Sequence, residues 1–389
     1  MGAKSTKYNR LGGLHLELSR YVFLCGETIE GIIHFSLSEE IPPSTLEFQF
    51  KGKEKTHWQR TYSTGKSSTT VHYVGEVYEC KVKYEVMSWD HPIRPGGYSI
   101  PFSFKTQDSV AGSFQFIKGT TNGYIYYAIS AKLYNPTEGL KGKTNIYMVN
   151  IPTTLNRNVN LVRNAQLVTW CCSNKGKLEF TLRLPKDTFF DTEPIEFLVD
   201  IDNTNGSLAV KKLAARLFYR VRIMDNSSLT NMTTTTLCKR KYSVHVDPGE
   251  KLLDSNAVKL NMDLGFISND IANMHSIQAI IIQCAFMLEV EIITNGSCMC
   301  CGEKSRIELP IVIVPAITTG PRVQPTAVEQ PPGWNPSVFN MVNLEYDPKY
   351  EIGGPKEEPN EDQEGKIPIY RNLSKKKDSV TELISQDQK

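Results

Sequence analysis

The chain has 389 residues, more than one ordinary β-sandwich needs and enough for two domains with additional terminal segments. Hydrophobic residues make up 40% and charged residues 22% of it, a globular composition that excludes a wholly disordered chain. With 44 basic and 42 acidic side chains the formal charge is +2, so no global charge attracts nucleic acid. The longest apolar runs have the length of strands, which excludes a membrane-spanning helix.

Cysteine usage and the first residues both favour an intracellular protein. Nine cysteines in a chain of this length indicate reduced thiols rather than a disulfide framework. Residues 1–7 contain no apolar segment of the kind that secretory signals carry. We therefore expect a cytoplasmic protein.

Alternation of apolar and polar residues predicts strands along most of the chain, beginning with Leu14, Leu16 and Leu18. Clusters of Gly, Pro, Asn and Asp separate the strands, and no long segment has the period of a helix. The first series of predicted strands continues over residues 28–37, 46–50, 71–86, 98–104, 124–133, 145–151 and 160–170. The second series covers residues 177–184, 195–201, 210–223, 237–246, 257–262, 276–293 and 306–314. Short strands at this spacing predict an all-β protein built from sandwiches.

The order of the segments predicts two immunoglobulin-like β-sandwiches in tandem. We expect a flexible segment over residues 1–12, an N-terminal sandwich over 13–170 and a C-terminal sandwich over 171–315. The boundary is expected where Cys, Ser, Asn and Gly interrupt two strands, at residues 171–176. After residue 315 the alternation ends and Pro, Glu, Lys and Gln dominate, so residues 316–389 are expected to form a mostly disordered tail.

An ordered set of turn and core residues runs through both predicted sandwiches. In the first it comprises Tyr21, Gly26, Glu27, Ile29, Gly31, Ile33, Gly52, Trp58, Pro95, Gly96, Tyr98, Pro101, Phe102, Ser103, Phe104, Ser113, Phe114, Gly123, Ile125 and Tyr127. In the second it comprises Cys171, Cys172, Gly176, Pro185, Glu193, Ile195, Asp202, Asn203, Leu309, Pro310, Ile311 and Ile313. In this order the set resembles the arrestin superfamily, specifically its α-arrestins, the arrestin-domain-containing proteins. The resemblance implies the arrestin fold and an adaptor that works by binding alone.

Motifs for catalysis are missing from the sequence. The seven histidines lack the spacing of a metal-binding helix, and the chain has neither a Gly-x-Ser-x-Gly elbow nor a glycine-rich phosphate loop. We therefore expect no enzymatic activity.

The amino terminus fits a lipidation pattern. Gly2 with Thr6 in the required position predicts N-myristoylation, and Lys4, Lys7 and Arg10 add positive charge. One acyl chain with nearby basic residues suits reversible attachment to an anionic membrane surface. The alternative is an unmodified, basic and flexible end.

Five cysteines lie in two turns of the predicted C-terminal sandwich. They are Cys171, Cys172, Cys298, Cys300 and Cys301. If the two turns share one end of the sandwich, their thiolates are suited to zinc, although the Cys-x-Cys-Cys spacing differs from the usual Cys-x-x-Cys knuckle. S-acylation of an exposed turn and plain buried thiols are the alternatives. We expect the protein to bind no cofactor, with zinc as the alternative.

The tail contains two candidate partner motifs. α-Arrestins typically recruit HECT-type ubiquitin ligases there, through Pro-Pro-x-Tyr motifs that bind WW domains. In this chain Pro331 and Pro332 are followed by Trp334 where the motif has Tyr, and Pro348 and Tyr350 follow an Asp where the motif has its first Pro. The alternative is ordinary linker sequence.

Lys51, Lys53 and Lys55 alternate along one predicted strand and so share a face. The resemblance implies that such a face reads acidic or phosphorylated segments of partners by charge pairing. The alternative is a solvated or edge-protecting row of lysines.

Together these features predict a cytoplasmic α-arrestin-like adaptor, peripheral at the plasma membrane or endosomes. Its expected partners are cytoplasmic segments of membrane proteins, a HECT-type ligase and the membrane surface, and not nucleic acid. One alternative is a retromer-type subunit that sorts membrane proteins without a ligase. The other is a zinc-binding signalling module built on the cysteines.

Overall fold

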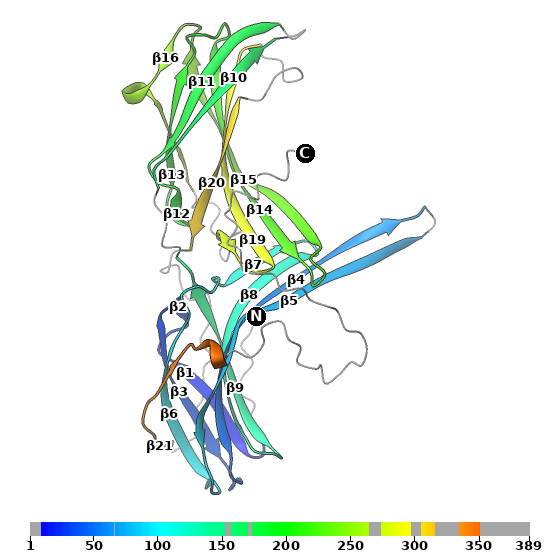
Figure 1. Ribbon diagram of the computed structural model, residues 1–389, viewed down its shortest axis with the longest axis vertical. Helices are drawn as coiled ribbons and strands as arrows, with labels where there is room; N and C mark the ends of the chain where they lie inside the picture. Colours follow the sequence, from blue (N-terminus) through cyan, green and yellow to red (C-terminus); the bar gives the residue numbers. More distant parts are fainter. Residues whose placement is uncertain are drawn as a thin grey trace.

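The computed structural model describes residues 9–65, 67–151, 157–169, 173–263, 274–296, 305–315 and 334–350. Within them the chain is built from β-strands, with short 3₁₀ turns at Asp254–Asn256 (η2) and Pro348–Tyr350 (η3). The strands form two sandwiches placed end to end (Figure 1). The predicted all-β class with two tandem sandwiches is confirmed. None of the described elements is a helix long and apolar enough to cross a bilayer.

The N-terminal sandwich packs two sheets face to face. One sheet has the order β1-β3-β6, with β21 and β22 both paired to β6, and the other has the order β2-β9-β8-β4-β5, with β7 paired to β8. The bounds of the first sheet are β1 Gly12–Leu18, β3 Thr28–Leu37, β6 Gly96–Lys105, β21 Ser337–Val338 and β22 Val342–Glu345. Those of the second are β2 Val22–Leu24, β4 Thr45–Ser63, β5 Ser68–Ser88, β7 Phe114–Lys118, β8 Thr121–Tyr134 and β9 Gly139–Val149.

Aromatic side chains fill the space between these two sheets. The ring of Phe48 on β4 lies 5.1 Å from Phe102 and 5.4 Å from Phe104 on β6, and Phe50 lies 5.0 Å from Phe104. All four side chains are fully buried. The alternation of large apolar residues along β4 and β6 therefore fixes which face of each strand points inward.

The C-terminal sandwich repeats this plan. One sheet has the order β10-β11-β13-β16, with β17 paired to β13, and the other has the order β12-β20-β19-β14-β15, with β18 paired to β19. The bounds of the first sheet are β10 Val159–Val168, β11 Asn174–Leu184, β13 Ile195–Asp202, β16 Lys251–Leu252 and β17 Val258–Met262. Those of the second are β12 Thr188–Phe190, β14 Val210–Met224, β15 Thr230–Val246, β18 Ile277–Gln278, β19 Ile282–Thr294 and β20 Arg306–Val314.

The boundary between the sandwiches differs from the predicted one. We expected the strand near residues 160–170 to close the N-terminal sandwich, but β10 pairs antiparallel with β11 in the C-terminal sandwich. Strands that follow each other closely in sequence pair as a hairpin, so the Cys- and Gly-containing segment at 171–176 connects two strands of one sheet. The chain passes from one sandwich to the other between Val149 and Val159.

Part of the predicted tail also differs from expectation. Residues 337–345 add two short strands to β6, in parallel (Figure 1, orange). Val342, Leu344 and Tyr346 alternate with polar residues, and Leu344 is buried. This short alternating run supplies enough apolar contact to pair with an existing strand, even though the surrounding composition is polar.

Both sandwiches contain the same short parallel strand pair, closed by a glutamate. In the first, Leu24 ends β2 beside β9, and its N–H donates to Glu27 at 2.8 Å. In the second, Phe190 ends β12 beside β20, and its N–H donates to Glu193 at 2.6 Å. Each carboxylate also pairs with a cation seven residues earlier, Arg20 for Glu27 and Lys186 for Glu193. Each of these cations also lies over a buried phenylalanine ring, Phe23 in the first sandwich and Phe189 in the second.

We predict that Glu193→Ala lowers the urea midpoint of the C-terminal sandwich. The variant leaves the Phe190 N–H and the Lys186 ammonium without their carboxylate, a loss of about 1–2 kcal/mol. Chemical denaturation followed by tryptophan fluorescence and circular dichroism measures the change. Glu196→Ala, which removes an exposed carboxylate three residues later, is the matched control. Equal midpoints for the two variants would show that the Glu193 bonds contribute nothing.

Candidate functional site

Lys51, Lys53 and Lys55 do lie together on one face of β4. The ammonium groups of Lys53 and Lys55 both pair with Glu76 on β5, the second at 2.9 Å. Lys53 is 8% exposed, whereas Lys55 is exposed to solvent. This is not an evenly solvated row, because part of it is held against the sheet.

Further lysines from neighbouring strands extend this face. Lys81 of β5 lies opposite Lys51 in the strand register, and the Nζ atoms of Lys51, Lys53 and Lys81 lie 5.9, 4.9 and 5.0 Å from the centre of the Tyr78 ring. Lys141 and Lys143 follow on β9. We call these six residues, Lys51, Lys53, Lys55, Lys81, Lys141 and Lys143, the lysine face. Tyr78 accepts three cation–π contacts, which hold the charges close together.

The charges of the lysine face repel one another. Burial lowers the pKa of Lys51, and the positive charges of Lys143, Lys53, Lys141 and Lys81 lower it further. Burial and neighbouring lysines lower the pKa of Lys143 in the same way. A bound anion would relieve this repulsion, so the face is suited to phosphate or carboxylate groups.

We predict that phosphate stabilises the protein through the lysine face. At constant ionic strength, replacing chloride by phosphate should raise the thermal midpoint by about 2 °C or more, because an anion that binds only the folded state stabilises it. The double variant Lys51→Gln, Lys143→Gln should lose most of that gain in differential scanning fluorimetry. Lys177→Gln, Lys211→Gln removes two exposed lysines of the C-terminal sandwich as the control. An equal loss in the control would mean that phosphate stabilises the protein through its net charge and not through the lysine face.

A buried carboxyl joins the two sandwiches. Glu54 on β4 is fully buried, and it accepts the backbone N–H of Ile280 at 2.8 Å and of Ile281 at 2.9 Å. These two residues connect β18 to β19 in the C-terminal sandwich. Nearby, the Thr56 hydroxyl donates to the Met224 carbonyl at 2.5 Å. The middle of β4 thus contacts backbone groups of the β18–β19 connection and of the last residue of β14 in the other domain.

A second carboxyl lies beside Glu54. Burial raises the pKa of Glu54 well above its usual range, and the hydrogen bond and charge of Glu79 raise it further. The Glu79 carboxylate also accepts the N–H of Ala111 at 3.4 Å. Two carboxyl groups in contact at a buried interface hold a proton between them more readily than two negative charges.

The raised pKa makes the stability of the folded chain depend on pH. The folded state keeps a proton on Glu54 at pH values where the unfolded chain has released it, so stability is greatest below the pKa of the unfolded chain and falls as pH rises from there through the folded pKa. We predict that Glu79→Gln flattens this dependence, because the amide donates to Glu54 without taking up a proton. Thermal midpoints measured from pH 5 to 8 test this.

Glu47→Gln, which changes a carboxyl elsewhere on β4, should keep the wild-type pH dependence of the midpoint. Parallel curves for wild type and Glu79→Gln would contradict the shared proton.

The two aromatic residues of the candidate tail motifs both pack on the N-terminal sandwich. Trp334 lies over β6 at Gly97, where a Cβ atom would be 2.8 Å from its ring, and 5.9 Å from the His34 ring of β3. Tyr350 lies 4.9 Å from the ring of Tyr84 on β5 and is 44% exposed. Pro348 begins the turn η3. The segment is therefore folded back on the domain, and the Pro348–Tyr350 turn is 3₁₀ rather than polyproline.

Several predicted site residues lie outside the part of the chain that the structure describes. They are Gly2, Pro331, Pro332, Cys171, Cys172, Cys298, Cys300 and Cys301. Lipidation and zinc binding there stay predictions. Among the described residues, no group of three or more His, Cys, Asp or Glu side chains is arranged to hold a metal ion.

The cysteines within the described ranges form no disulfide; they are Cys25, Cys80, Cys238 and Cys284. Burial, with the charges of Glu79 and Asp108, raises the pKa of Cys25 to about 12. Burial alone raises the pKa of Cys284. Such thiols stay protonated and behave as small apolar side chains.

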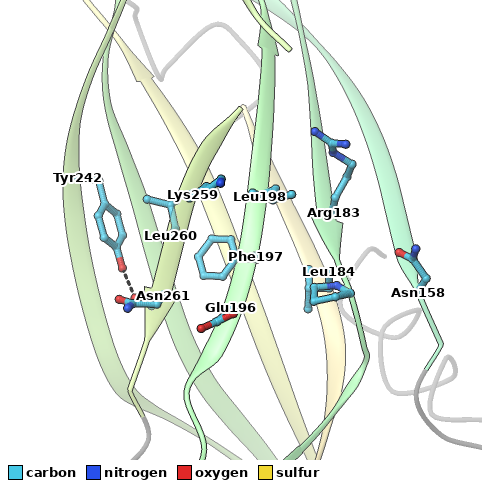
Figure 2. A pocket seen from close by; sticks show the side chains of 11 residues that line it. Asn158, Arg183, Leu184, Glu196, Phe197, Leu198, Tyr242, Lys259, Leu260 and Asn261 are labelled. Atoms are coloured by element: carbon cyan, nitrogen blue, oxygen red, sulfur yellow. Dashed lines mark hydrogen bonds between the residues drawn. The ribbon is translucent and has the colours of Figure 1, made fainter. Parts of the chain in front are cut away.

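A depression of about 570 Å³ lies on the C-terminal sandwich (Figure 2). Arg183, Glu196, Tyr242 and Lys259 are among its lining side chains. The Tyr242 hydroxyl donates to the Asn261 carbonyl at 2.6 Å, and Arg183 makes two contacts with Asp200, at 2.6 and 2.7 Å. Tyr242 and Arg183 are thus hydrogen-bonded within the protein, and the lining includes no histidine or cysteine, so we assign no chemistry to this depression.

Sequence reasoning missed the lysines on the partner strands and the interface carboxyls. Lys81 and Lys143 join the lysine face only through strand register, which the sequence does not reveal. Glu54 could not be recognised from the sequence because it lies in the same alternating stretch as Lys51, Lys53 and Lys55. The strand in the tail could have been predicted from the alternation of Val342, Leu344 and Tyr346 with polar residues.

Two linked β-sandwiches, each with a short parallel strand pair, define the class of this protein, and comparison with known families agrees. Residues 14–156 match the family model of the N-terminal domain of arrestin (or S-antigen), and residues 174–316 match that of the C-terminal domain. The chain belongs to the arrestin family. Proteins of this family are generally non-enzymatic adaptors, so the chain has an arrestin-type adaptor or scaffold role.

Proposed function

We propose that the protein is an α-arrestin-like adaptor that binds cytoplasmic segments of membrane proteins through the lysine face. The observation that carries this proposal is the crowding of six lysines on one face of the N-terminal sandwich, four of which contact Tyr78 or Glu76. Mutual repulsion disfavours such a cluster unless an anionic ligand compensates it. An acidic or phosphorylated segment of a membrane protein has the charge that this face needs.

We also propose that the adaptor acts in trafficking or ubiquitin-dependent sorting at the plasma membrane or endosomes. A myristoyl group on Gly2, near Lys4 and Lys7, supplies reversible attachment to the membrane surface. Trp334 and the Pro348–Tyr350 turn are the candidate contacts for WW domains of a HECT-type ligase. Neither proposal requires catalysis or nucleic acid.

A sorting role without a ligase is the second candidate. The packing of Tyr350 against Tyr84 favours it, because this arrangement does not present the tyrosine as an extended polyproline ligand. In that case the protein selects membrane proteins in the manner of a retromer-type subunit.

Proximity labelling in the native cell separates the two candidates. We expect the full chain to label membrane proteins and a HECT-type ligase, and Tyr350→Ala to lose the ligase while it keeps the membrane proteins. Tyr62→Ala, which removes an exposed tyrosine on β4, is the matched control. Coat or retrieval proteins in every sample, without a ligase in any, would establish the second candidate.

The charge-reduced variant Lys51→Gln, Lys143→Gln tests binding through the lysine face in the same assay. It should lose the membrane proteins, and their retention would refute binding through the lysine face.

A further inference from the structure

Two histidine side chains face each other across the long hairpin of β4 and β5. His72 on β5 lies opposite Gln59, which follows His57 by two residues on β4, so the two histidines are diagonal neighbours on one face. Their ring centres are 5.5 Å apart, and Nε2 of His57 lies 3.2 Å from Nδ1 of His72. His72 is exposed and His57 is half-buried. The two strands therefore bring two ring nitrogens together at a point that solvent reaches.

A third group fixes the orientation of the His57 ring. Its Nδ1 atom lies 3.2 Å from the carbonyl oxygen of Thr120, in the turn between β7 and β8. A carbonyl oxygen only accepts hydrogen bonds, so Nδ1 carries a proton and donates it. In the neutral ring Nε2 is then unprotonated, and its lone pair faces His72. Histidines that bind metal ions are held in the same way, because their other ring nitrogen donates to a carbonyl or a carboxylate.

The separation of the two nitrogens fits two ligands of one metal ion. Zinc binds imidazole nitrogen at about 2.0–2.1 Å, and tetrahedral geometry then places two ligand nitrogens about 3.3 Å apart. The hydrogen bond from Nδ1 of His72 to Nε2 of His57 already holds these atoms 3.2 Å apart. When the rings tilt and an ion binds between them, the proton leaves Nδ1 of His72, and that ring is protonated at Nε2 instead. Imidazole suits zinc, copper and nickel, whereas Mg²⁺ prefers oxygen ligands.

The histidine pair lies where the hairpin leaves the rest of its sheet. β4 pairs with β8 as far as His57, which lies opposite Asn122. Beyond this position the described residues of β4 pair with β5 alone, up to the turn between Ser63 and Ser68. Figure 1 shows this part of the hairpin projecting from the molecule. A two-stranded hairpin is only marginally stable by itself, so a link between its strands at this point would stabilise it.

The two basic residues of β4 on either side of His57 are held by other groups. Lys55 shares the face of His57, and its ammonium group pairs with Glu76 at 2.9 Å. Arg60 lies on the opposite face, where its guanidinium group lies 5.8 Å from the centre of the Tyr73 ring. Neither positive group is therefore directed at the two histidines.

We propose that His57 and His72 form a two-histidine chelate for a divalent transition metal ion such as zinc, at the base of the projecting hairpin. Each ring supplies one nitrogen, and the remaining coordination positions are open to water or to a side chain of a bound protein. With half the protein ligands of a structural zinc site, the expected dissociation constant is on the order of 10 µM. The bound ion ties β4 to β5 and, through the Thr120 carbonyl, to the turn between β7 and β8.

Zinc binding to four full-length chains tests the proposal: wild type, His57→Gln, His72→Gln and His245→Gln. His245→Gln removes an exposed histidine of the C-terminal sandwich and is the matched control. All four chains keep the same cysteines, so a difference between them reports the histidines alone. In equilibrium dialysis at about 100 µM free zinc, we expect wild type and the control to bind one zinc ion more than His57→Gln or His72→Gln. The affinity of the site should fall at least about ten-fold in these two variants.

Hydrogen exchange locates the bound ion. Zinc should slow the exchange of amides between residues 57 and 72 at least about five-fold in wild type and the control, and leave them unchanged in the other two chains. Mg²⁺ at the same concentration should have no effect. Equal zinc content of all four chains, or the same protection by Mg²⁺, would overturn the proposal. A dissociation constant weaker than about 1 mM would also overturn it, because the pair would then be a hydrogen bond and not a metal site.

Discussion

A buried carboxyl group anchors the contact between the two sandwiches. Glu54 lies at full burial on β4 and accepts two consecutive N–H groups from the connection between β18 and β19. Buried backbone donors must be satisfied, and a side chain from the other domain satisfies these two. Because burial and the neighbouring Glu79 raise the pKa of Glu54, this contact depends on the protonation of Glu54. The same strand carries the lysine face on its other side, so the lysine face and the domain contact are one residue apart.

The alternation of side chains along β4 places the lysine face and the domain contact on the same strand. Lys53 and Lys55 flank Glu54 on β4, and strand geometry sends the two lysine side chains to one face of the sheet and the Glu54 side chain to the other. β4 is therefore the element that the lysine face and the domain contact share.

Sequence reasoning predicted the strands well and the long-range contacts poorly. Alternation along Phe48 and Phe50, or Phe102 and Phe104, is a local property and marks an inward face without knowledge of the partner. Membership of β10 in the second sandwich depends on its pairing with β11, which composition does not encode. The lysine face was predicted on β4 alone because its other members come from β5 and β9. In the tail, the overall polar composition concealed a short run that needs the edge of β6 to become a strand.

The glutamates that close the short parallel strands belong to a structural unit that both sandwiches contain. A cation, a phenylalanine and a glutamate recur with the same spacing in each sandwich, as Arg20, Phe23 and Glu27 and as Lys186, Phe189 and Glu193. The two halves thus share one local structural unit. Among the described residues, the lysine face and the tail contacts belong to the N-terminal sandwich alone. The fold therefore uses the same way of closing a sheet edge twice, while the features that distinguish the two sandwiches lie outside that unit.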